Sequence, residues 1–482
     1  MERGFERVLE LFRQINAIPR CSGNESGLRE WIDAWAAGLG FSRNTDAYGN
    51  LMIRVPATES SPAVILQGHM DMVCEKPPES PHDFTTAPIE VLLTGDWIHA
   101  NDTTLGADNG IALALAMAVS EFREFPHPPL ELLFTVEEET GLVGAMNLDP
   151  EMLSGEIMLN LDSDREAEFT VGCAGGRTTT LEITLMPAGT VYDSNAINIS
   201  VGGLTGGHSG TDIHRNRANA NLVLAEVLRA FRPFRLVEIS GGTASNAIPR
   251  EASATILSDP AESPNAAAAA QAAVEALKTS YADTDPGMDI VFEETRSHSG
   301  FSPLSPAASS VVVDLLLALP NGIVSMEKGM EGCVETSCNV ARIDWHNSAM
   351  RIIVSQRSSN ISSLDGLTRR IEAVASLAGC KTEAGRYYPS WLPRPDSPVL
   401  ARSLKIHENI FGVKPKIRVV HAGLECGVIG SLRPGMDMLS FGVTIENPHS
   451  PTERMLKPSV QRTLLFLTEL LRSLAEKPLA KA

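Results

Sequence analysis

The chain has 482 residues, of which 43% are hydrophobic and 21% charged, and its formal net charge is −19. This composition excludes a disordered or collagen-like protein, and the acidic balance argues against nucleic acid or an anionic membrane as a partner. The length predicts two or three domains, each with a core of its own.

The first twelve residues predict an amphipathic helix and not a signal peptide, because charges stand where a signal peptide needs an apolar core. No apolar run reaches transmembrane length. The seven cysteines are scattered and contain no Cys-x-x-Cys pair, so neither a disulfide framework nor a zinc ribbon is expected. We therefore expect a cytoplasmic protein.

Up to about residue 190, helices alternate with short apolar strands, which is typical of an α/β domain. Three of the expected strands, over 63–67, 130–136 and 157–161, run into His69, the acids Glu137 to Glu139, and Asp162. Because the ligand site of an α/β sheet lies beyond the carboxyl ends of its strands, these side chains are candidates for one site. A helix over 106–122 begins beside Asp108.

From residue 191 to 387 the strands become longer and the helices carry no acidic cluster, which predicts an inserted α+β domain. Its first part reads as one βαββαβ unit, and a similar series begins at residue 307, so the insert could be duplicated. From residue 388 to 482 the α/β pattern returns. This segment is expected to complete the mixed, helix-flanked sheet begun by residues 1–190.

His69 and Asp71 share one face of their strand, so the Asp71 carboxylate can hold the imidazole in one tautomer while the other ring nitrogen faces a metal or a substrate. Taken alone, this pair could equally be a solvated strand end. Three other single features have similar alternatives: Asp108 could be a helix N-cap, Glu137 to Glu139 an acidic turn, and His449 a loop residue.

Together, five residues form a two-histidine, three-carboxylate set: His69, Asp108, Glu139, Asp162 and His449. Mixed nitrogen and oxygen ligands suit Zn²⁺, with Mn²⁺ or Co²⁺ tolerated. Three carboxylates for two divalent ions leave one to bridge, and Asp108, between glycines at a helix start, is the best candidate. A metal pair about 3.5–4 Å apart can lower the pKa of water from about 15.7 to near 7. Glu138, beside Glu139, offers a general base.

Seven short motifs follow one another along nearly the whole chain: Gly68-His69-Met70-Asp71, Thr103-Thr104-Leu105-Gly106-Ala107-Asp108-Asn109-Gly110, Glu138-Glu139-Thr140-Gly141, Asn160-Leu161-Asp162-Ser163, Gly206-Gly207-His208-Ser209-Gly210, His421-Ala422-Gly423-Leu424-Glu425-Cys426-Gly427 and Pro448-His449-Ser450-Pro451. In this order they are specific. The sequence resembles the co-catalytic zinc metallopeptidases of the aminoacylase and carboxypeptidase-G type, and within them the carnosinase-like aminoacyl-histidine (Xaa-His) dipeptidases.

The resemblance implies a two-zinc site. His69 and Asp162 would hold one ion, Glu139 and His449 the other, and Asp108 would bridge them. Asp71 would orient His69, and Glu138 would act as the base. Glu137 departs from the family pattern, in which many relatives have Asp at this position, and leaves the register of base and ligand open by one residue.

The resemblance also implies substrate-binding residues. His208 of the insert would stabilise the oxyanion, and Arg357 and Gly423 would receive the terminal carboxylate of the substrate. Asn246 would add a hydrogen bond, although an Asn there equally serves a turn, and Arg357 could instead be a surface ion-pair partner.

The prediction is a di-zinc metallopeptidase that hydrolyses dipeptides of the Xaa-His type. The insert would act as a lid or as a dimerisation module of a homodimer, and His208 would then act within its own chain or on its partner. A tripeptidase or an aminoacylase with the same fold is one alternative. A metal-binding protein without catalysis is the other.

Overall fold

A computed structural model describes residues 2–59, 61–122, 125–192, 194–258, 263–297, 300–328, 330, 332–385, 387–394 and 396–479. The chain forms two compact units, one made of Met1–Cys173 with Trp391–Ala482 and the other of Ala174–Ser390. The sequence places these boundaries after residues 190 and 387. The first boundary differs because strand β9 (Gly175–Thr184) pairs with strands of the second unit.

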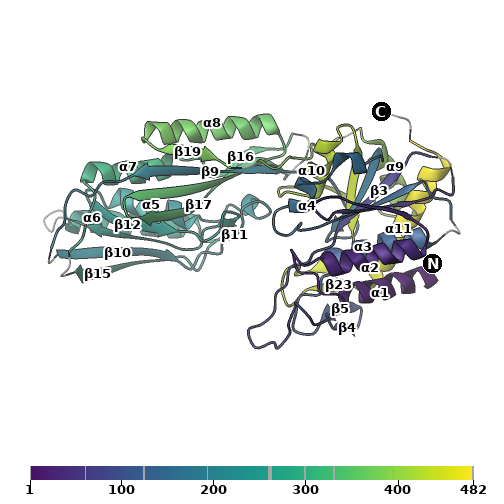
Figure 1. The fold of residues 1–482 in the computed structure, drawn as a ribbon. Helices are drawn as coiled ribbons and strands as arrows, with labels where there is room; N and C mark the ends of the chain where they lie inside the picture. Colours follow the sequence, from purple (N-terminus) through teal and green to yellow (C-terminus); the bar gives the residue numbers. More distant parts are fainter. Residues whose placement is uncertain are drawn as a thin grey trace. The chain divides into compact units, whose positions relative to one another are not determined.

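The first unit is built on an eight-stranded mixed sheet (Figure 1). In spatial order its strands are β1 (Ser42–Thr45), β2 (Leu51–Val55), β6 (Leu130–Thr135), β3 (Val64–His69), β7 (Ile157–Ser163), β21 (Asp437–Gly442), β8 (Glu168–Cys173) and β20 (Lys416–Val420). Strands β6, β3, β7 and β21 run parallel, so their carboxyl ends meet at one edge of the sheet. Strands β20 and β21, from the last segment of the chain, complete this sheet.

Helices cover both faces of this sheet (Figure 1). Helix α3 (Ala107–Glu121) packs on β3 and β7, and a Cβ atom at Gly68 would lie 2.9 Å from the Cβ of Ala112, so only glycine permits this approach. Gln67 points to the opposite face. There its amide donates to Glu425, the first residue of α10 (Glu425–Leu432). The remaining helices of the unit are α1 (Glu2–Asn16), α2 (Ser26–Gly38), α4 (Val143–Met146), α9 (Pro398–Phe411) and α11 (Lys457–Glu476).

A smaller four-stranded sheet in the same unit carries the loop that contains His449. Its strands, in spatial order, are β22 (Ile445–Glu446), β23 (Arg454–Leu456), β5 (Trp97–Ala100) and β4 (Val91–Thr94). Because β22 and β23 pair as an antiparallel hairpin, residues 447–453 form its turn.

The second unit is built on a nine-stranded antiparallel sheet. Its strands, in spatial order, are β15 (Asp289–Ser297), β10 (Ser194–Gly202), β14 (Ala252–Leu257), β12 (Arg235–Gly241), β17 (Val334–His346), β18 (Ala349–Ser358), β9 and β19 (Lys381–Ala384), with β16 (Gly322–Met326) beside β17. Four helices belong to the same unit: α5 (Ala220–Ala230), α6 (Ser263–Ser280), α7 (Pro306–Ala318) and α8 (Ile361–Leu377).

The sheet of the second unit is a structural duplication, as the sequence suggested. One half runs β10-α5-β12-β14-α6-β15 and the other β9-α7-β17-β18-α8-β19. When the strands of each half are numbered along the chain, both halves have the spatial order 4-1-3-2, counted in each half from the outer edge of the sheet. The two halves join where β12 pairs with β17. The first half is inserted between β9 and α7 of the second. The sequence missed this nesting because β9 lies next to the strands of the first unit in the chain.

Cys21 and Cys74 form a disulfide bond, which sequence analysis did not anticipate. The two segments meet through a parallel bridge between Cys21 and Met72, a long-range contact that cysteine spacing does not reveal. Within the described residues, no helix has both the length and the apolar character needed to cross a membrane.

Candidate active site

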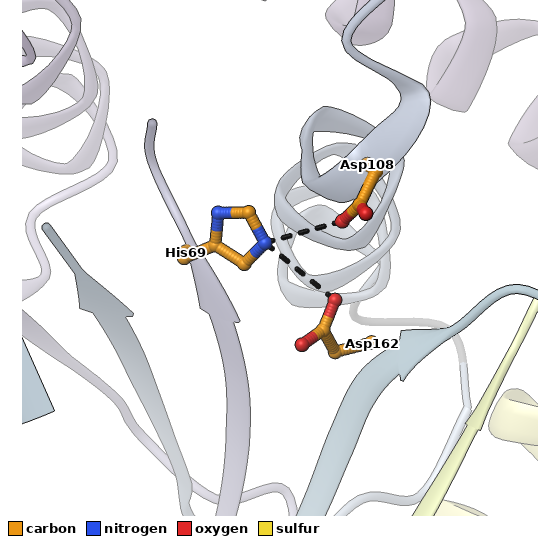
Figure 2. A group of neighbouring side chains, drawn as sticks. All are labelled: His69, Asp108 and Asp162. Atoms are coloured by element: carbon orange, nitrogen blue, oxygen red, sulfur yellow. Dashed lines mark hydrogen bonds and ion pairs between the residues drawn. The ribbon is translucent and has the colours of Figure 1, made fainter. Parts of the chain in front are cut away.

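Four of the predicted metal ligands come together because three parallel strands end side by side. His69 is the last residue of β3, Asp162 lies near the end of β7, and Glu139 follows the end of β6. Asp108 enters from the start of α3. His69 Nε2 lies 3.2 Å from Asp108 Oδ1 and 3.6 Å from Asp162 Oδ1, as Figure 2 shows.

The fifth predicted ligand, His449, reaches the same place from the β22–β23 turn. Its Nε2 lies 3.1 Å from Asp108 Oδ2 and 3.0 Å from Glu139 Oε1. Asp108 therefore directs one carboxylate oxygen to the His69 group and the other to the His449 group. Glu139 Oε1 is buried and, despite the short distance to His449, has no partner in hydrogen-bond geometry among the described residues.

Potential ligand atoms lie within 4.8 Å of one another in three overlapping groups: His69 with Asp108 and Asp162, His69 with Glu138 and Glu139, and Asp108 with Glu139 and His449. Among the residues that the structure describes, Glu137 belongs to none of these groups. Carboxylate oxygens and imidazole nitrogens at such separations are suited to divalent ions.

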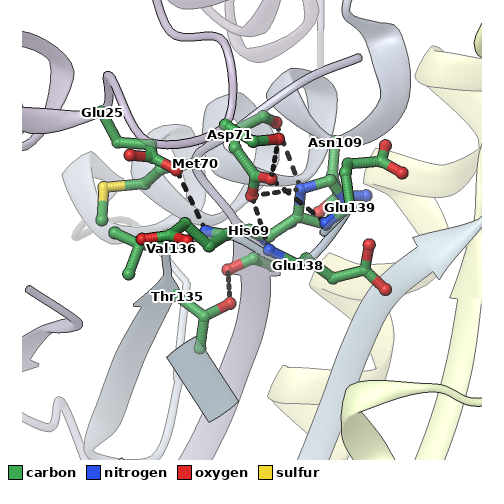
Figure 3. Close-up of polar contacts among 12 residues, drawn as sticks. Glu25, His69, Met70, Asp71, Asn109, Thr135, Val136, Glu138 and Glu139 are labelled. Carbon is green, nitrogen blue, oxygen red and sulfur yellow. Dashed lines mark hydrogen bonds and ion pairs between the residues drawn. The ribbon is translucent and has the colours of Figure 1, made fainter. Parts of the chain in front are cut away.

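Asp71 is buried below the cluster and contacts both the His69 imidazole and the backbone of the acidic segment. Its Oδ1 lies 3.2 Å from His69 Nδ1, and the same oxygen accepts the backbone N–H of Glu138 at 3.0 Å. Its Oδ2 accepts the N–H of Glu139 at 3.1 Å and the hydroxyl of Ser22 at 2.7 Å (Figure 3). Asp71 therefore fixes both the imidazole and the acidic segment beside it.

Glu25 holds the backbone of Glu137, the residue before Glu138, in a similar way, and the sequence did not reveal this contact. Its Oε1 accepts the N–H of Glu137 at 3.0 Å (Figure 3). The residue occupies the N-cap position of α2 without capping it through its side chain. An isolated acid at a helix start gives no sequence signal for this contact.

Burial and the crowding of carboxylates determine the electrostatics. The carboxylates of Asp108 and Glu139 raise the pKa of His449 to about 11. Burial alone would lower the pKa of His69, but the hydrogen bonds to Asp108 and Asp162 raise it well above its usual range. Burial raises the pKa of Asp162 to about 6 and that of Glu138 well above its usual range. A cluster with this excess of negative charge is stabilised by cations.

A buried polar layer lies on the α10 face of β3. Glu425 Oε2 accepts the amide of Gln67 at 2.5 Å and the hydroxyl of Thr135 at 2.7 Å, and burial raises the pKa of Glu425 to about 7. The Gln67 carbonyl accepts the amide of Asn160 at 2.5 Å. Sequence analysis recognised the motif around Glu425 but assigned the residue no role.

Three predicted substrate residues lie in the second unit, where they come together. Strand β11 (Gly207–His208) pairs with β13 (Ala247–Ile248), and the carbonyl of Asn246 accepts the N–H of Ser209 at 2.7 Å. Arg357, near the end of β18, directs Nη2 to within 3.4 Å of His208 Nε2. Its Nη1 donates to Tyr388 Oη at 2.8 Å. Gly423 lies in the first unit, between β20 and α10.

His208 is a neutral imidazole. Burial and the Arg357 guanidinium lower its pKa to about 4. Its Nδ1 accepts the backbone N–H groups of Gly210 and Thr211 at 3.3 and 3.0 Å, so its single proton lies on Nε2. The Nε2–H group and the Arg357 guanidinium are thus two donors turned toward the same place, as a bound anionic oxygen would require.

The chain is similar to known proteins along nearly its whole length. The sequence profile of Peptidase family M20/M25/M40 matches residues 65–473. The cytosol non-specific dipeptidase of Escherichia coli (strain K12) is 37% identical over 474 residues, 97% of each chain. The crystal structure of aminoacylhistidine dipeptidase from Vibrio alginolyticus has a TM-score of 0.86 at 37% identity and covers 97% of this chain and 96% of its own.

A more distant structure shares the fold alone: a tripeptidase from Staphylococcus aureus, with a TM-score of 0.57 and 16% identity, covering 98% of this chain and 99% of its own. The profile match spans most of the sequence, and the two dipeptidases match over nearly its full length. This chain therefore belongs to Peptidase family M20/M25/M40.

Proposed function

We propose that this chain hydrolyses the peptide bond of dipeptides at a pair of divalent metal ions. The observation that carries the proposal is the division of the Asp108 carboxylate between two ligand groups, with Oδ1 beside His69 and Oδ2 beside His449. A shared carboxylate of this kind is what a two-metal site requires. The similarity to dipeptidases over nearly the full length of the chain supports the reaction class.

The donor set fits two Zn²⁺ ions, with Mn²⁺ or Co²⁺ also suited to it. His69 and Asp162 would hold one ion, Glu139 and His449 the other, and Asp108 both. The buried Oε1 of Glu139, which lies 3.0 Å from His449 Nε2, supports this assignment. When bound, the ions would acidify water in the site and polarise the substrate carbonyl.

Glu138 is the proposed general base. Asp71 positions its backbone, and Glu138 offers a carboxylate oxygen within 4.8 Å of ligand atoms of His69 and Glu139. It would accept the proton of the attacking water and later deliver it to the leaving amine. The raised pKa of Glu138 suits the first step, because a more basic carboxylate accepts a proton more readily.

The second unit would supply the groups that bind the substrate. His208 Nε2–H would donate to the oxyanion, and the Arg357 guanidinium, together with Gly423, would receive the terminal carboxylate. Arg357 Nε is buried without a hydrogen-bond partner among the described residues, which supports this role. Asn246, exposed beside β13, would add a further hydrogen bond. These assignments require the second unit to act as a lid.

The duplication of the second unit supports action of His208 within its own chain. A single insert would have to serve a partner subunit, whereas a duplicated one can complete the site alone. A homodimer is then not required for activity. We place the enzyme in the cytoplasm, following the printed name of the Escherichia coli relative.

A substrate panel with the metal-free and the reconstituted protein tests the proposal. Dipeptides, including those with C-terminal histidine, are expected to be cleaved only after Zn²⁺, Mn²⁺ or Co²⁺ is restored. A tripeptide and an N-acyl amino acid serve as controls for the other specificities of this fold. Two bound ions without turnover of any substrate would instead indicate a metal-binding protein, and preference for the N-acyl amino acid would indicate an aminoacylase.

A further inference from the structure

Glu453 is a buried carboxylate that the proposed mechanism does not use. It is only 2% exposed and lies in the same β22–β23 turn as His449. A buried carboxylate is costly unless each of its oxygens is satisfied. The structure satisfies both, and it does so with backbone groups alone among the described hydrogen bonds.

Each oxygen of Glu453 accepts two consecutive backbone N–H groups. Oε2 accepts those of Leu105 and Gly106 at 2.7 and 2.9 Å. Oε1 accepts those of Ala107 and Asp108 at 2.8 and 3.3 Å. These four groups belong to the turn that leads into α3, so the carboxylate binds the backbone that carries the shared ligand Asp108.

The opposite side of this turn is held by Arg20. Its Nη2 donates to the carbonyl of Gly106 at 2.5 Å, and its Nη1 donates to the carbonyls of Met70 and Asp71 at 3.0 and 2.9 Å. Gly106 has a φ of 67°, in the left-handed region, and a Cβ atom there would collide with the Arg20 guanidinium and lie 2.7 Å from the sulfur of Met72. The turn is therefore held from both sides, by an anion on its N–H groups and by a cation on its carbonyl.

We infer that Glu453 is a positioning residue that sets the separation of Asp108 and His449 and thereby builds one of the two metal positions. The inference rests on the proposed two-metal function. The position between Asp108, Glu139 and His449 depends on two residues that Glu453 locates, one through its hydrogen bonds and one through the turn. The position between His69, Asp108 and Asp162 depends on only one. Loss of Glu453 should therefore weaken the first position selectively.

The test compares Glu453→Gln with Glu446→Gln. Glutamine has nearly the same size, but its NH₂ group cannot accept the two N–H groups that one oxygen now binds. Glu446, the last residue of β22, lies directly before the same turn and pairs with Arg454 at the surface, so its substitution controls for loss of a charge. Zn²⁺ affinity at each position is measured by chelator competition, and Co²⁺-substituted protein gives an absorption spectrum for each.

We expect one Zn²⁺ to bind about 10- to 100-fold more weakly in Glu453→Gln while the other keeps the affinity of the parent, the usual scale for residues behind metal ligands. Glu446→Gln should bind both ions normally. Equal weakening of both ions, or no weakening, would overturn the inference. If the parent itself binds fewer than two ions, the proposed function fails and not the role of Glu453.

Two further measurements keep the inference testable if Glu453→Gln does not fold. Glu453→Asp keeps the charge but shortens the reach, and should show the same selective loss in a milder form. In the metal-free parent, the backbone N–H groups of residues 105–108 should exchange slowly with solvent, because Glu453 holds them before any ion binds. Rapid exchange of these groups in the folded metal-free protein would refute a preformed position.

Discussion

The division of work between Glu138 and Glu139 gives the sharpest test of the active site. Glu138→Gln keeps the shape of the side chain and removes the base. Because burial and the neighbouring carboxylates of Asp162 and Glu139 raise the pKa of Glu138, a neutral amide relieves repulsion there, and we expect no loss of thermal stability. All five proposed ligands remain, so two ions should still bind.

Loss of a general base lowers the rate about 10²- to 10⁴-fold, which corresponds to about 2.7–5.4 kcal/mol of transition-state stabilisation. Glu139→Gln should behave differently. It replaces the oxygen that lies 3.0 Å from His449 Nε2 and should lower the metal content as well as the rate.

The assay measures zinc content and kcat on one dipeptide for both variants and for Glu137→Gln, which is the matched control. Glu137→Gln should bind two ions and remain active, because its carboxylate belongs to no ligand group of the described residues. If Glu138→Gln loses zinc while Glu137→Gln stays loaded and inert, the register of base and ligand is shifted by one residue.

Three further predictions concern the second unit. Arg357→Lys removes a planar fork of donors and should raise KM about 10- to 100-fold with little change in kcat, and dipeptides amidated at the C-terminus should be poor substrates of the parent; equal cleavage of amides and free acids would exclude this role. Inactive His208→Ala and Glu138→Gln chains, mixed, should not regain activity, since a duplicated lid serves its own site; recovery would show action on a partner. His208 has a pKa of about 4 in the folded protein, against an ordinary value of 6.5. As the pH falls, His208 is therefore protonated in the unfolded chain before it is protonated in the folded one. The fold should then lose up to about 2–3 kcal/mol between pH 6.5 and 4, and this loss should be absent in thermal unfolding of His208→Gln.

Much of the candidate metal site could be predicted because its residues follow regular elements with clear periodicity. His69, Glu139 and Asp162 lie at or shortly after the ends of the apolar runs that become β3, β6 and β7. Parallel strands bring such ends together. The approach of His449 could be expected only from the resemblance, since a histidine between prolines has no periodic signal.

What could not be predicted depends on contacts between distant segments. Strand β9 has an ordinary strand sequence, but nothing local indicates that it pairs with β18. In the sequence Glu25 stands at a helix start and Glu453 in a loop, and only the fold shows that their carboxylates accept backbone N–H groups. Helix α10 is short and contains two glycines, which weaken its helical pattern.

The nesting of one half-sheet inside the other sets an order in which the protein can assemble during synthesis. The inserted half, β10 to β15, forms all its internal pairings within residues 194–297, whereas β9 must wait for β18 at residues 349–358. The same delay affects the catalytic centre, because His449 follows Asp162 by 287 residues. A growing chain thus carries four of the five proposed ligands long before the last one, and the proposed site is complete only after the β22–β23 turn has been made.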